Sequence, residues 1–278
     1  MKKKTQIMVC CHKNDFVYRG NGFLPIQVGK ALSSLDLGMT SDDTGENISD
    51  KNANYCELTA QYWLWKKDVD ADFIGLNHYR RYFDFRNHSH GYFFQNISET
   101  QATDSRLALP DLTRIFQKCD IILSEPIVYP LSIEMQYALA HGKQDLLQLR
   151  NTIMELYPEY IDAYDRFFNQ NKISLCNMFV MKKETFMDYS RWLFNILFTV
   201  EKKIKLSEDA YQRRIFGFMG ERLLNVYAEH HKLRIAYRPI LKISEERPLN
   251  KYKGILKRMI NQLTFFIVSK ESECKIRY

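Results

Sequence analysis

Short apolar runs alternate along this chain with segments in which apolar residues recur every three or four positions. The runs predict buried strands at residues 5–11, 70–76, 119–124, 174–182 and 234–238. The periodic segments predict helices at 30–35, 55–67, 112–118, 133–157, 160–169, 186–203 and within 208–230. This alternation is typical of an α/β fold with a mostly parallel central sheet flanked by helices.

Two polar segments interrupt the pattern. Residues 41–49 contain a glycine among short polar side chains, which predicts a loop. Residues 87–106 are also polar, and we expect a flexible insertion or lid there.

The last thirty positions differ from the rest, so we divide the chain into a main domain, 1–248, and a basic amphipathic tail, 249–278. In the tail, basic residues surround an apolar set: Ile255, Leu256, Met259, Ile260, Leu263, Phe265, Phe266 and Ile267. One interpretation is a helix lying in a membrane interface. The other is a terminal helix that docks on the domain and leaves a basic face in solvent.

Composition narrows the class of partner. The chain has 278 residues, a formal net charge of +7 and a pI near 8.9, which suits nucleic acid, an anionic membrane or a phosphorylated substrate. Much of the excess charge lies in the tail and no nucleic-acid motif is present, so we expect no nucleic-acid partner. The six cysteines have no zinc spacing, which favours free thiols.

The expected location is cytoplasmic and peripheral, at the inner face of the cytoplasmic membrane. The basic start of the chain is followed by no signal-peptide core. The sequence also has no run of about 18 apolar residues, the length a membrane-spanning helix needs.

The strongest chemical signal follows the predicted strand at 70–76, where His78, Tyr79, Arg80 and Arg81 occur together. Ligands bind at the carboxyl ends of strands in open α/β sheets, and arginine pairs with phosphate oxygens in bidentate geometry. Many nucleotide-sugar enzymes hold a metal there with an Asp-x-Asp pair. In this sequence His78 and Arg80 stand where those carboxylates are expected. We therefore expect cationic side chains to neutralise a diphosphate, with no cofactor and no metal ligand assigned. A manganese or magnesium ion is the alternative. A structural arginine cluster that bridges loops is the other interpretation.

A second group of candidates suits the donor. Asp42, Asp43, Thr44 and Asn47 are suited to sugar or ribose hydroxyls, although two adjacent aspartates can also hold a divalent cation and such residues are common in turns. His12 and Lys13 follow the first predicted strand, and we expect the lysine to reach a phosphate there. Tyr79 belongs to the same donor group.

The acceptor side contains the candidate base. An inverting sugar transfer needs one base near the acceptor hydroxyl, and Glu221, behind a glycine at a predicted helix start, is the candidate. The competing interpretation is a carboxylate that pairs with Arg222 or Arg214 at a helix terminus. We assign His141, Asn177 and Arg222 to acceptor binding.

Common nucleotide and hydrolase signatures are missing. The sequence contains no G-x-x-x-x-G-K-[ST], no G-x-G-x-x-G and no G-x-S-x-G. This removes the usual motif evidence for an NTPase, a dinucleotide-dependent enzyme or an α/β-hydrolase.

Several longer motifs resemble a bacterial family of capsule and O-antigen gene clusters, formerly catalogued as a domain of unknown function (DUF4422) and now regarded as glycosyltransferases that include β-1,3-galactofuranosyltransferases. The motifs are Pro25–Gly29, Asp42–Ser49, Asn54–Thr59, Tyr62–Trp63, Trp65–Lys66, Ile74–Phe83, Asn177–Phe179, Trp192–Phe194 and Gly217–Leu223. The resemblance covers about Thr5 to Arg238 and leaves out the tail.

The resemblance implies a GT-A-like fold, a UDP-sugar donor such as UDP-galactofuranose, and a lipid-linked oligosaccharide acceptor. It also favours His78, Arg80, Arg81, Asp43 and Glu221 as residues of the active site. The resulting prediction is a hexosyltransferase of capsule or O-antigen polysaccharide biosynthesis, acting with inversion at an anionic membrane surface. The alternative is a non-catalytic module that binds nucleotides or glycans during polysaccharide assembly.

Overall fold

The computed structural model describes residues 3–86, 93–244 and 251–275, and all of their side chains except those of residues 104, 105, 251 and 270–275. Its main sheet runs in the order β11-β7-β10-β4-β1-β2-β3, and β5, β6 and β12 extend it beside β4. The strands are β1 (Thr5–Cys11), β2 (Phe23–Gln27), β3 (Thr40–Ser41), β4 (Phe73–His78), β5 (Arg81–Phe83), β6 (Phe94–Ile97), β7 (Ile121–Ser124), β10 (Phe179–Lys182), β11 (Ile235–Arg238) and β12 (Ile240–Ile243). A separate two-stranded sheet pairs β8 (Ile127–Val128) with β9 (Lys172–Ile173).

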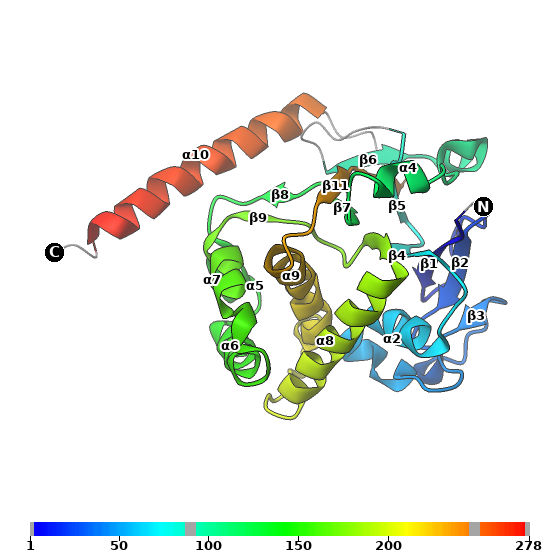
Figure 1. The fold of residues 1–278 in the computed structure, drawn as a ribbon, viewed down its shortest axis with the longest axis horizontal. Coiled ribbons are helices and arrows are strands. Elements are labelled where there is room, and N and C mark those ends of the chain that lie inside the picture. Colours follow the sequence, from blue (N-terminus) through cyan, green and yellow to red (C-terminus); the bar gives the residue numbers. More distant parts are fainter. Residues whose placement is uncertain (1–2, 87–92, 245–250, 276–278) are drawn as a thin grey trace.

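Helices lie on both faces of the main sheet (Figure 1). They are α1 (Asn52–Tyr55), α2 (Leu58–Lys67), α3 (Glu99–Gln101), α4 (Thr113–Phe116), α5 (Ile133–Ala140), α6 (Lys143–Leu156), α7 (Ile161–Asn169), α8 (Lys183–Glu201), α9 (Ile215–His230) and α10 (Lys251–Lys275). The expected α/β architecture is confirmed.

Strand β1 lies inside the sheet and is buried on both faces. Met8 and Cys10 belong to the large core that the sheet forms with α2 and α5–α9, whereas Ile7 and Val9 face two smaller clusters on the other side. A strand that is buried on both faces has a continuous apolar run rather than an alternating one, which is why residues 5–11 could be identified from the sequence.

The segment predicted as a strand at 174–182 is only partly one. β10 begins at Phe179, and it runs antiparallel to both neighbours, β4 and β7. The preceding Cys176 and Asn177 have φ of 76° and 48°, so the chain turns there instead of continuing in the sheet. The other neighbouring pairs of the main path, β1–β2, β1–β4, β2–β3 and β7–β11, are parallel.

Two further predictions need correction. The helix expected at 55–67 is broken at Cys56, whose φ of 52° separates α1 from α2. The polar segment 87–106 contains β6, α3 and a π-helical turn at Ala102–Arg106 rather than only a loop, while residues 87–92 lie outside the described ones. The segment is ordered because β6 pairs with β12. The local sequence did not indicate this pairing, since β12 comes from a distant part of the chain.

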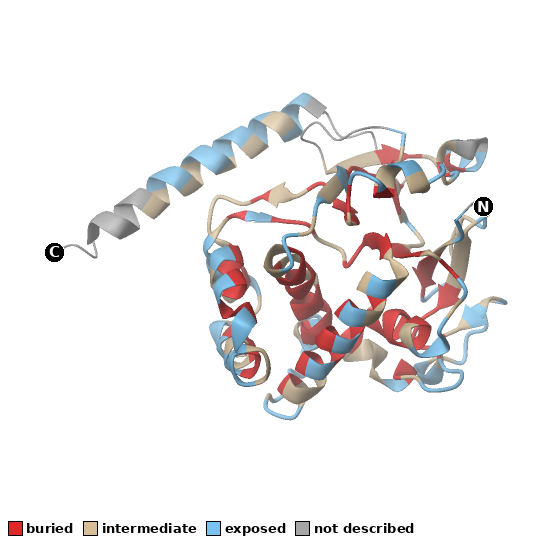
Figure 2. Cartoon of the chain, in the orientation of Figure 1, coloured by how far each residue is buried: buried red, intermediate tan, exposed pale blue. Residues whose placement is uncertain are grey.

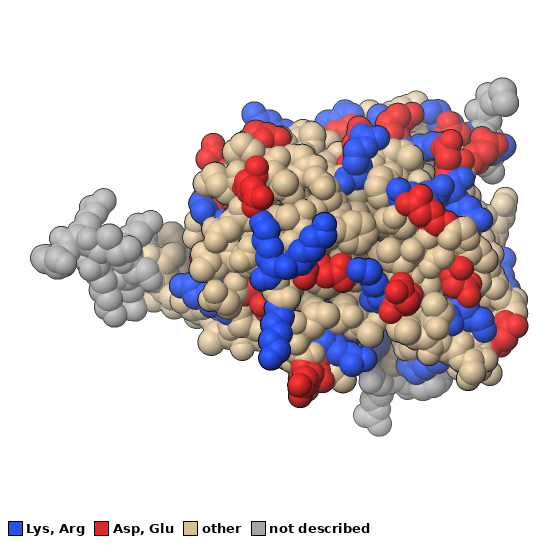
Figure 3. Space-filling model, turned by 90° about the horizontal axis from the view of Figure 1, so that it is seen from below, with Lys and Arg blue, Asp and Glu red and all other residues tan. Residues whose placement is uncertain are grey.

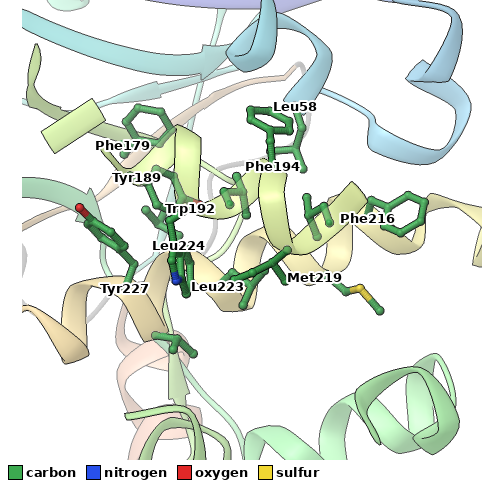
Figure 4. Packing of buried hydrophobic residues seen from close by; sticks show 14 of the residues in the cluster. Leu58, Phe179, Tyr189, Trp192, Phe194, Phe216, Met219, Leu223, Leu224 and Tyr227 are labelled. Atoms are coloured by element: carbon green, nitrogen blue, oxygen red, sulfur yellow. The ribbon is translucent and has the colours of Figure 1, made fainter. Parts of the chain in front are cut away.

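Helix α9 is fixed by a buried aromatic seam. Phe216, Met219, Leu223 and Leu224 face Phe194, Trp192 and Tyr189 of α8, with Phe179 of β10 above them (Figure 4). These side chains are almost completely buried, so α9 is held rigidly against α8 and the sheet.

Helix α10 extends from the body of the protein with much of its surface in solvent (Figures 1 and 2). Two of its side chains bind the body: Arg258 Nη1 lies 2.6 Å from Glu125 Oε1, and Asn261 donates to the Val128 carbonyl at 2.7 Å. The boundary expected between residues 248 and 249 lies outside the described residues. Within the described part of the chain, no helix has both the length and the apolarity needed to cross a membrane.

Candidate active site

A cleft of about 830 Å³ opens at the carboxyl ends of β1 and β4. Its wall is completed by the segment after β4, the α1–α2 junction, α5, the turn before β10 and the start of α9. Of the site residues predicted from the sequence, the cleft is lined by His12, His78, Tyr79, Arg80, Arg81, His141, Glu221 and Arg222. Residues from four distant sequence segments therefore meet in one cavity.

His78 and Cys10 are paired across β4 and β1, so the ends of both strands form the cleft floor. His78 Nε2 lies 2.7 Å from the Cys176 carbonyl, which requires the Nε2–H tautomer because a carbonyl only accepts. Burial lowers the pKa of His78, and the charge of Arg81 lowers it further, whereas Glu57 raises it. A neutral imidazole with its Nδ1 free to accept is the form this environment favours.

Cationic side chains outnumber carboxylates around the cleft. Among the described residues, Arg80, Arg81, Arg213, Arg214, Arg222 and Lys242 line it, against two carboxylates, Glu57 and Glu221. This excess of positive charge suits an anionic ligand such as a diphosphate.

Three of these arginines have different surroundings in the cleft. Arg80 pairs with Asp15 at 2.6 Å and keeps about half of its side chain exposed. Arg214 donates to the Cys56 sulfur at 3.2 Å and lies over the rings of Tyr211 and Phe218. Arg81 lines the cleft, and its buried Nε has no hydrogen-bond partner among the described residues.

Glu221 lies in the second turn of α9 and has both carboxylate oxygens engaged. Oε1 accepts from the Cys176 amide at 2.8 Å, and Oε2 pairs with Arg222 Nη1 at 2.8 Å. Arg222 is almost fully buried and also donates to Gln136 and to the Phe218 carbonyl. Burial raises the pKa of Glu221, Arg222 lowers it and the charge of Glu57 raises it.

Glu57 is a second carboxylate of the cleft that we did not assign from the sequence. It precedes α2 and accepts a hydrogen bond of 2.7 Å from Asn177 Nδ2. Asn177 itself is buried behind the cleft wall and also binds the Gly217 carbonyl, so it supports the site rather than lining it. The motif Asn54–Thr59 contains Glu57 and was the available signal.

His141 belongs to an aromatic group at the other side of the cleft. Its ring stacks on Phe218 at 4.0 Å between centroids and lies 5.9 Å from Tyr211, and its Nδ1 is 3.2 Å from Gln212 Oε1. Burial lowers the pKa of His141, and Gln212 raises it. Tyr211 is more than half exposed and lines the cleft, so an aromatic face is open to a ligand there.

Asp42 is not among the residues that line the cleft. Its carboxylate is fully buried and accepts from the Gly29 and Lys30 amides and from the Ser49 and Thr59 hydroxyls. These four bonds tie the 41–49 loop to β2 and α2, and they leave the side chain no freedom to reach a ligand. The structure thus gives Asp42 a structural place.

The remaining predicted donor residues also lie outside the cleft lining. Asp43 accepts from Ser41, Thr44 accepts from the Trp63 indole, and Asn47 closes a turn through Gly45 and Ser49. Lys13 follows β1 beside His12, and its ammonium lies 3.7 Å from Asp15. Among the described residues, no group of three or more His, Cys, Asp or Glu side chains is arranged to hold a metal.

A solved structure resembles this chain closely. The "WbbM bifunctional glycosytransferase apo structure" superposes with a TM-score of 0.80 at 30% identity, over 89% of this chain and 48% of that one. This chain therefore spans about half the length of WbbM.

The mannosyltransferase Ktr4p from S. cerevisiae matches with a TM-score of only 0.31 at 9% identity, over 89% of this chain and 76% of that chain, and we draw nothing from it. No curated protein matches the sequence significantly.

A family model described as "Domain of unknown function (DUF4422)" matches residues 6–232, a range that contains every cleft residue discussed above except Lys242. The match covers most of the chain and leaves out α10. The protein belongs to this DUF4422 family.

Proposed function

We propose that the protein is a glycosyltransferase that moves a sugar from a nucleotide-sugar donor to a glycan acceptor. The observation that carries this proposal is the cleft itself, where a group of arginines and a carboxylate held on α9 meet at the carboxyl ends of β1 and β4. A departing diphosphate needs cations, and an attacking hydroxyl needs a base, so both chemical requirements are present in one cavity.

The likeness to WbbM supports the proposal, because that protein is described as a bifunctional glycosyltransferase. This chain corresponds to about half of WbbM, so we propose one sugar transfer for it. The GT-A-like fold and UDP-galactofuranose as donor follow from the sequence resemblance and are part of the proposal.

At the donor end, Arg80, Arg81 and Arg214 neutralise the diphosphate. Bidentate arginine binding becomes stronger as negative charge accumulates on the leaving phosphate. His12 and Tyr79 pack edge to face, 5.6 Å apart, beside these arginines and contact the nucleotide. This arrangement supplies the charge that a divalent cation supplies in other nucleotide-sugar enzymes.

At the acceptor end, Glu221 takes the proton from the attacking hydroxyl. The hydroxyl oxygen forms a bond to the anomeric carbon as the bond to the diphosphate oxygen breaks, so configuration inverts in one step. The Cys176 amide and Arg222 hold the carboxylate in place. Tyr211 and the stacked pair of His141 and Phe218 offer aromatic faces to the acceptor sugar.

Helix α10 supports an acceptor at a membrane surface. Arg258 and Asn261 bind the body, and Phe265 and Val268 are half-buried on the same side of the helix. Seven large apolar residues are exposed on the described part of α10: Tyr252, Leu256, Met259, Ile260, Leu263, Phe266 and Ile267. At 100° per residue these seven fall within an arc of roughly 120°, and Ile255 widens the apolar face to roughly 140°. Lys253 and Lys257 flank it, as expected for an interfacial helix on anionic lipid.

The second interpretation drawn from the sequence, a helix that docks on the domain and leaves a basic face in solvent, is the alternative to this proposal. Arg258, one of the basic residues of the tail, pairs with Glu125 of the body. We propose that α10 places the cleft at the anionic inner leaflet, where it meets a lipid-linked oligosaccharide.

Nucleic acid is not part of the proposal. On the face of the molecule seen from below, Lys and Arg side chains lie among Asp and Glu side chains (Figure 3). A surface of mixed sign does not suit a polyanion, whereas the cleft concentrates positive charge.

The test is donor turnover by the purified full chain, with a panel of nucleotide sugars that includes UDP-galactofuranose, a lipid-like sugar acceptor, and parallel reactions with EDTA. We expect UDP release that requires acceptor and survives EDTA. Activity that is lost to EDTA and restored by manganese would support a transferase. It would also show that the arginines do not neutralise the diphosphate without a metal ion. Nucleotide binding with no release or transfer would instead favour a binding module.

A further inference from the structure

The cleft contains a carboxylate that the proposed mechanism does not use, Glu57. It lies directly after Cys56, whose φ of 52° forces the chain to turn between α1 and α2. Asn177, with φ of 48°, holds Glu57 Oε1 from behind at 2.7 Å. Two residues in the left-handed region thus fix the position of one carboxylate.

Glu57 lines the same cleft as the arginines and Glu221. Its charge acts on groups from three sides of the cleft: it raises the pKa of Cys10 at the end of β1, of His78 at the end of β4, and of Glu221 on α9. Because Glu57 also lines the cleft together with Arg81 and Glu221, it is placed to meet a sugar bound there.

The two carboxylates differ in their bonding. Both oxygens of Glu221 are engaged by protein groups, whereas the described residues supply Glu57 with one hydrogen bond, to Oε1. Glu57 Oε2 is therefore available to accept a hydrogen bond from a ligand in the cleft. A carboxylate that is oriented by one amide and open at its other oxygen is suited to accept hydrogen bonds from sugar hydroxyls.

We propose that Glu57 is a sugar-binding and specificity-determining residue, whose Oε2 accepts a hydrogen bond from a hydroxyl of the donor or acceptor sugar. The proposal rests on the proposed function and adds to it the group that reads the sugar rather than the nucleotide. Removing the charge while keeping the shape weakens a charge-assisted hydrogen bond, which corresponds to about ten- to a hundredfold in affinity.

The experiment compares the wild type with E57Q by calorimetric binding of UDP and of UDP-galactofuranose, together with the KM for the acceptor. Glutamine keeps an oxygen for Asn177, and unchanged UDP binding shows that the cleft is intact. Weaker UDP-galactofuranose binding with unchanged UDP binding places the hydroxyl on the donor. Unchanged binding of both with a raised acceptor KM places it on the acceptor. E184Q, which alters an exposed glutamate of α8, is the control.

Three results would overturn this role. The first is E57Q with wild-type affinities and KM. The second is equal weakening of UDP and UDP-galactofuranose, which would make Glu57 a residue of the nucleotide site. The third is a loss of kcat together with its pH dependence at unchanged affinities, which would make Glu57 the base. A wild type that binds neither nucleotide overturns the proposed function, and this role with it.

Discussion

The backbone amide of Cys176 donates a hydrogen bond of 2.8 Å to Glu221, and the carbonyl of the same residue lies 2.7 Å from His78 Nε2. The next residue, Asn177, holds Glu57. One turn before β10 therefore organises an imidazole and two carboxylates that come from β4, α9 and the α1–α2 junction. Because Cys176 and Asn177 both have positive φ, the chain keeps a locally unfavourable conformation where the site needs it.

Replacing Glu221 with glutamine should remove transfer and leave donor binding largely intact. Glutamine keeps the size of the side chain but cannot accept the proton of the hydroxyl, and loss of a general base costs about 10²- to 10⁴-fold in rate. The measurement is kcat for transfer alongside the calorimetric Kd for UDP. E184Q should behave as wild type in both, and full activity in E221Q would show that another group takes the proton.

The rate of transfer should depend on pH through Glu221. Burial raises the pKa of this carboxyl above the ordinary glutamate value of about 4.3. A base works only when deprotonated, so kcat should fall as pH falls through the raised pKa and should level off above it. A pH profile of kcat measures this, and an acid limb at or below the ordinary value would contradict the assignment.

Much of the fold could be predicted because its strands and helices have strong local patterns. β1 and α7 were located to within a residue, since one is a continuous apolar run and the other has an apolar residue on each inward turn. The direction of β10 could not be predicted, because it depends on pairing with β4 and β7 and on a turn at two non-glycine residues. The short strand β12 pairs with β5 and β6, which are distant in the sequence, so local patterns did not indicate it.

The candidate site was predictable where a strand carries its residues to the cleft. His78 is the last residue of β4, and Arg80 and Arg81 come shortly after it, so the general rule about strand ends placed them. Asp42 shows the limit of such reasoning, because a buried carboxylate that holds a loop and one that holds a sugar occur among the same short polar residues. Only the four donors around it distinguish the two uses.

Changing Asp42 to asparagine should destabilise the protein and leave the affinity for UDP unchanged in the folded fraction. Each oxygen of Asp42 accepts from two donors, so an amide NH₂ would face a backbone N–H and a hydroxyl. We expect a loss of about 3 kcal/mol in the free energy of unfolding. Urea titration measures it, with D43N as the matched exposed control; weaker UDP binding without destabilisation would restore Asp42 to the donor site.

The arginines should act on phosphate and not on the nucleoside. R81Q and R214Q should each weaken UDP binding about tenfold or more, because each removes a charge-assisted hydrogen bond, while any binding of uridine should not change. R191Q alters an exposed arginine paired with Asp188 on α8 and is the control. Equal loss of UDP and uridine binding would mean that the substitutions disturb the cleft rather than remove phosphate contacts.

The apolar side of α10 should bind anionic lipid. Leu263 and Phe266 are each more than half exposed there, and placing glutamates at both positions removes two large apolar groups and adds repulsion from the lipid. Burial of each such side chain contributes about 1.5–3 kcal/mol, so the double variant L263E/F266E should bind phosphatidylglycerol vesicles at least about a hundredfold more weakly. Vesicle sedimentation measures this, and L147E, a change at a half-exposed leucine of α6, should bind as wild type.

Transfer to a soluble acceptor should be unaffected in the double variant, because these side chains do not line the cleft. A wild type that ignores vesicles but forms a dimer abolished by L263E/F266E would instead assign the apolar side of α10 to a second copy of the chain.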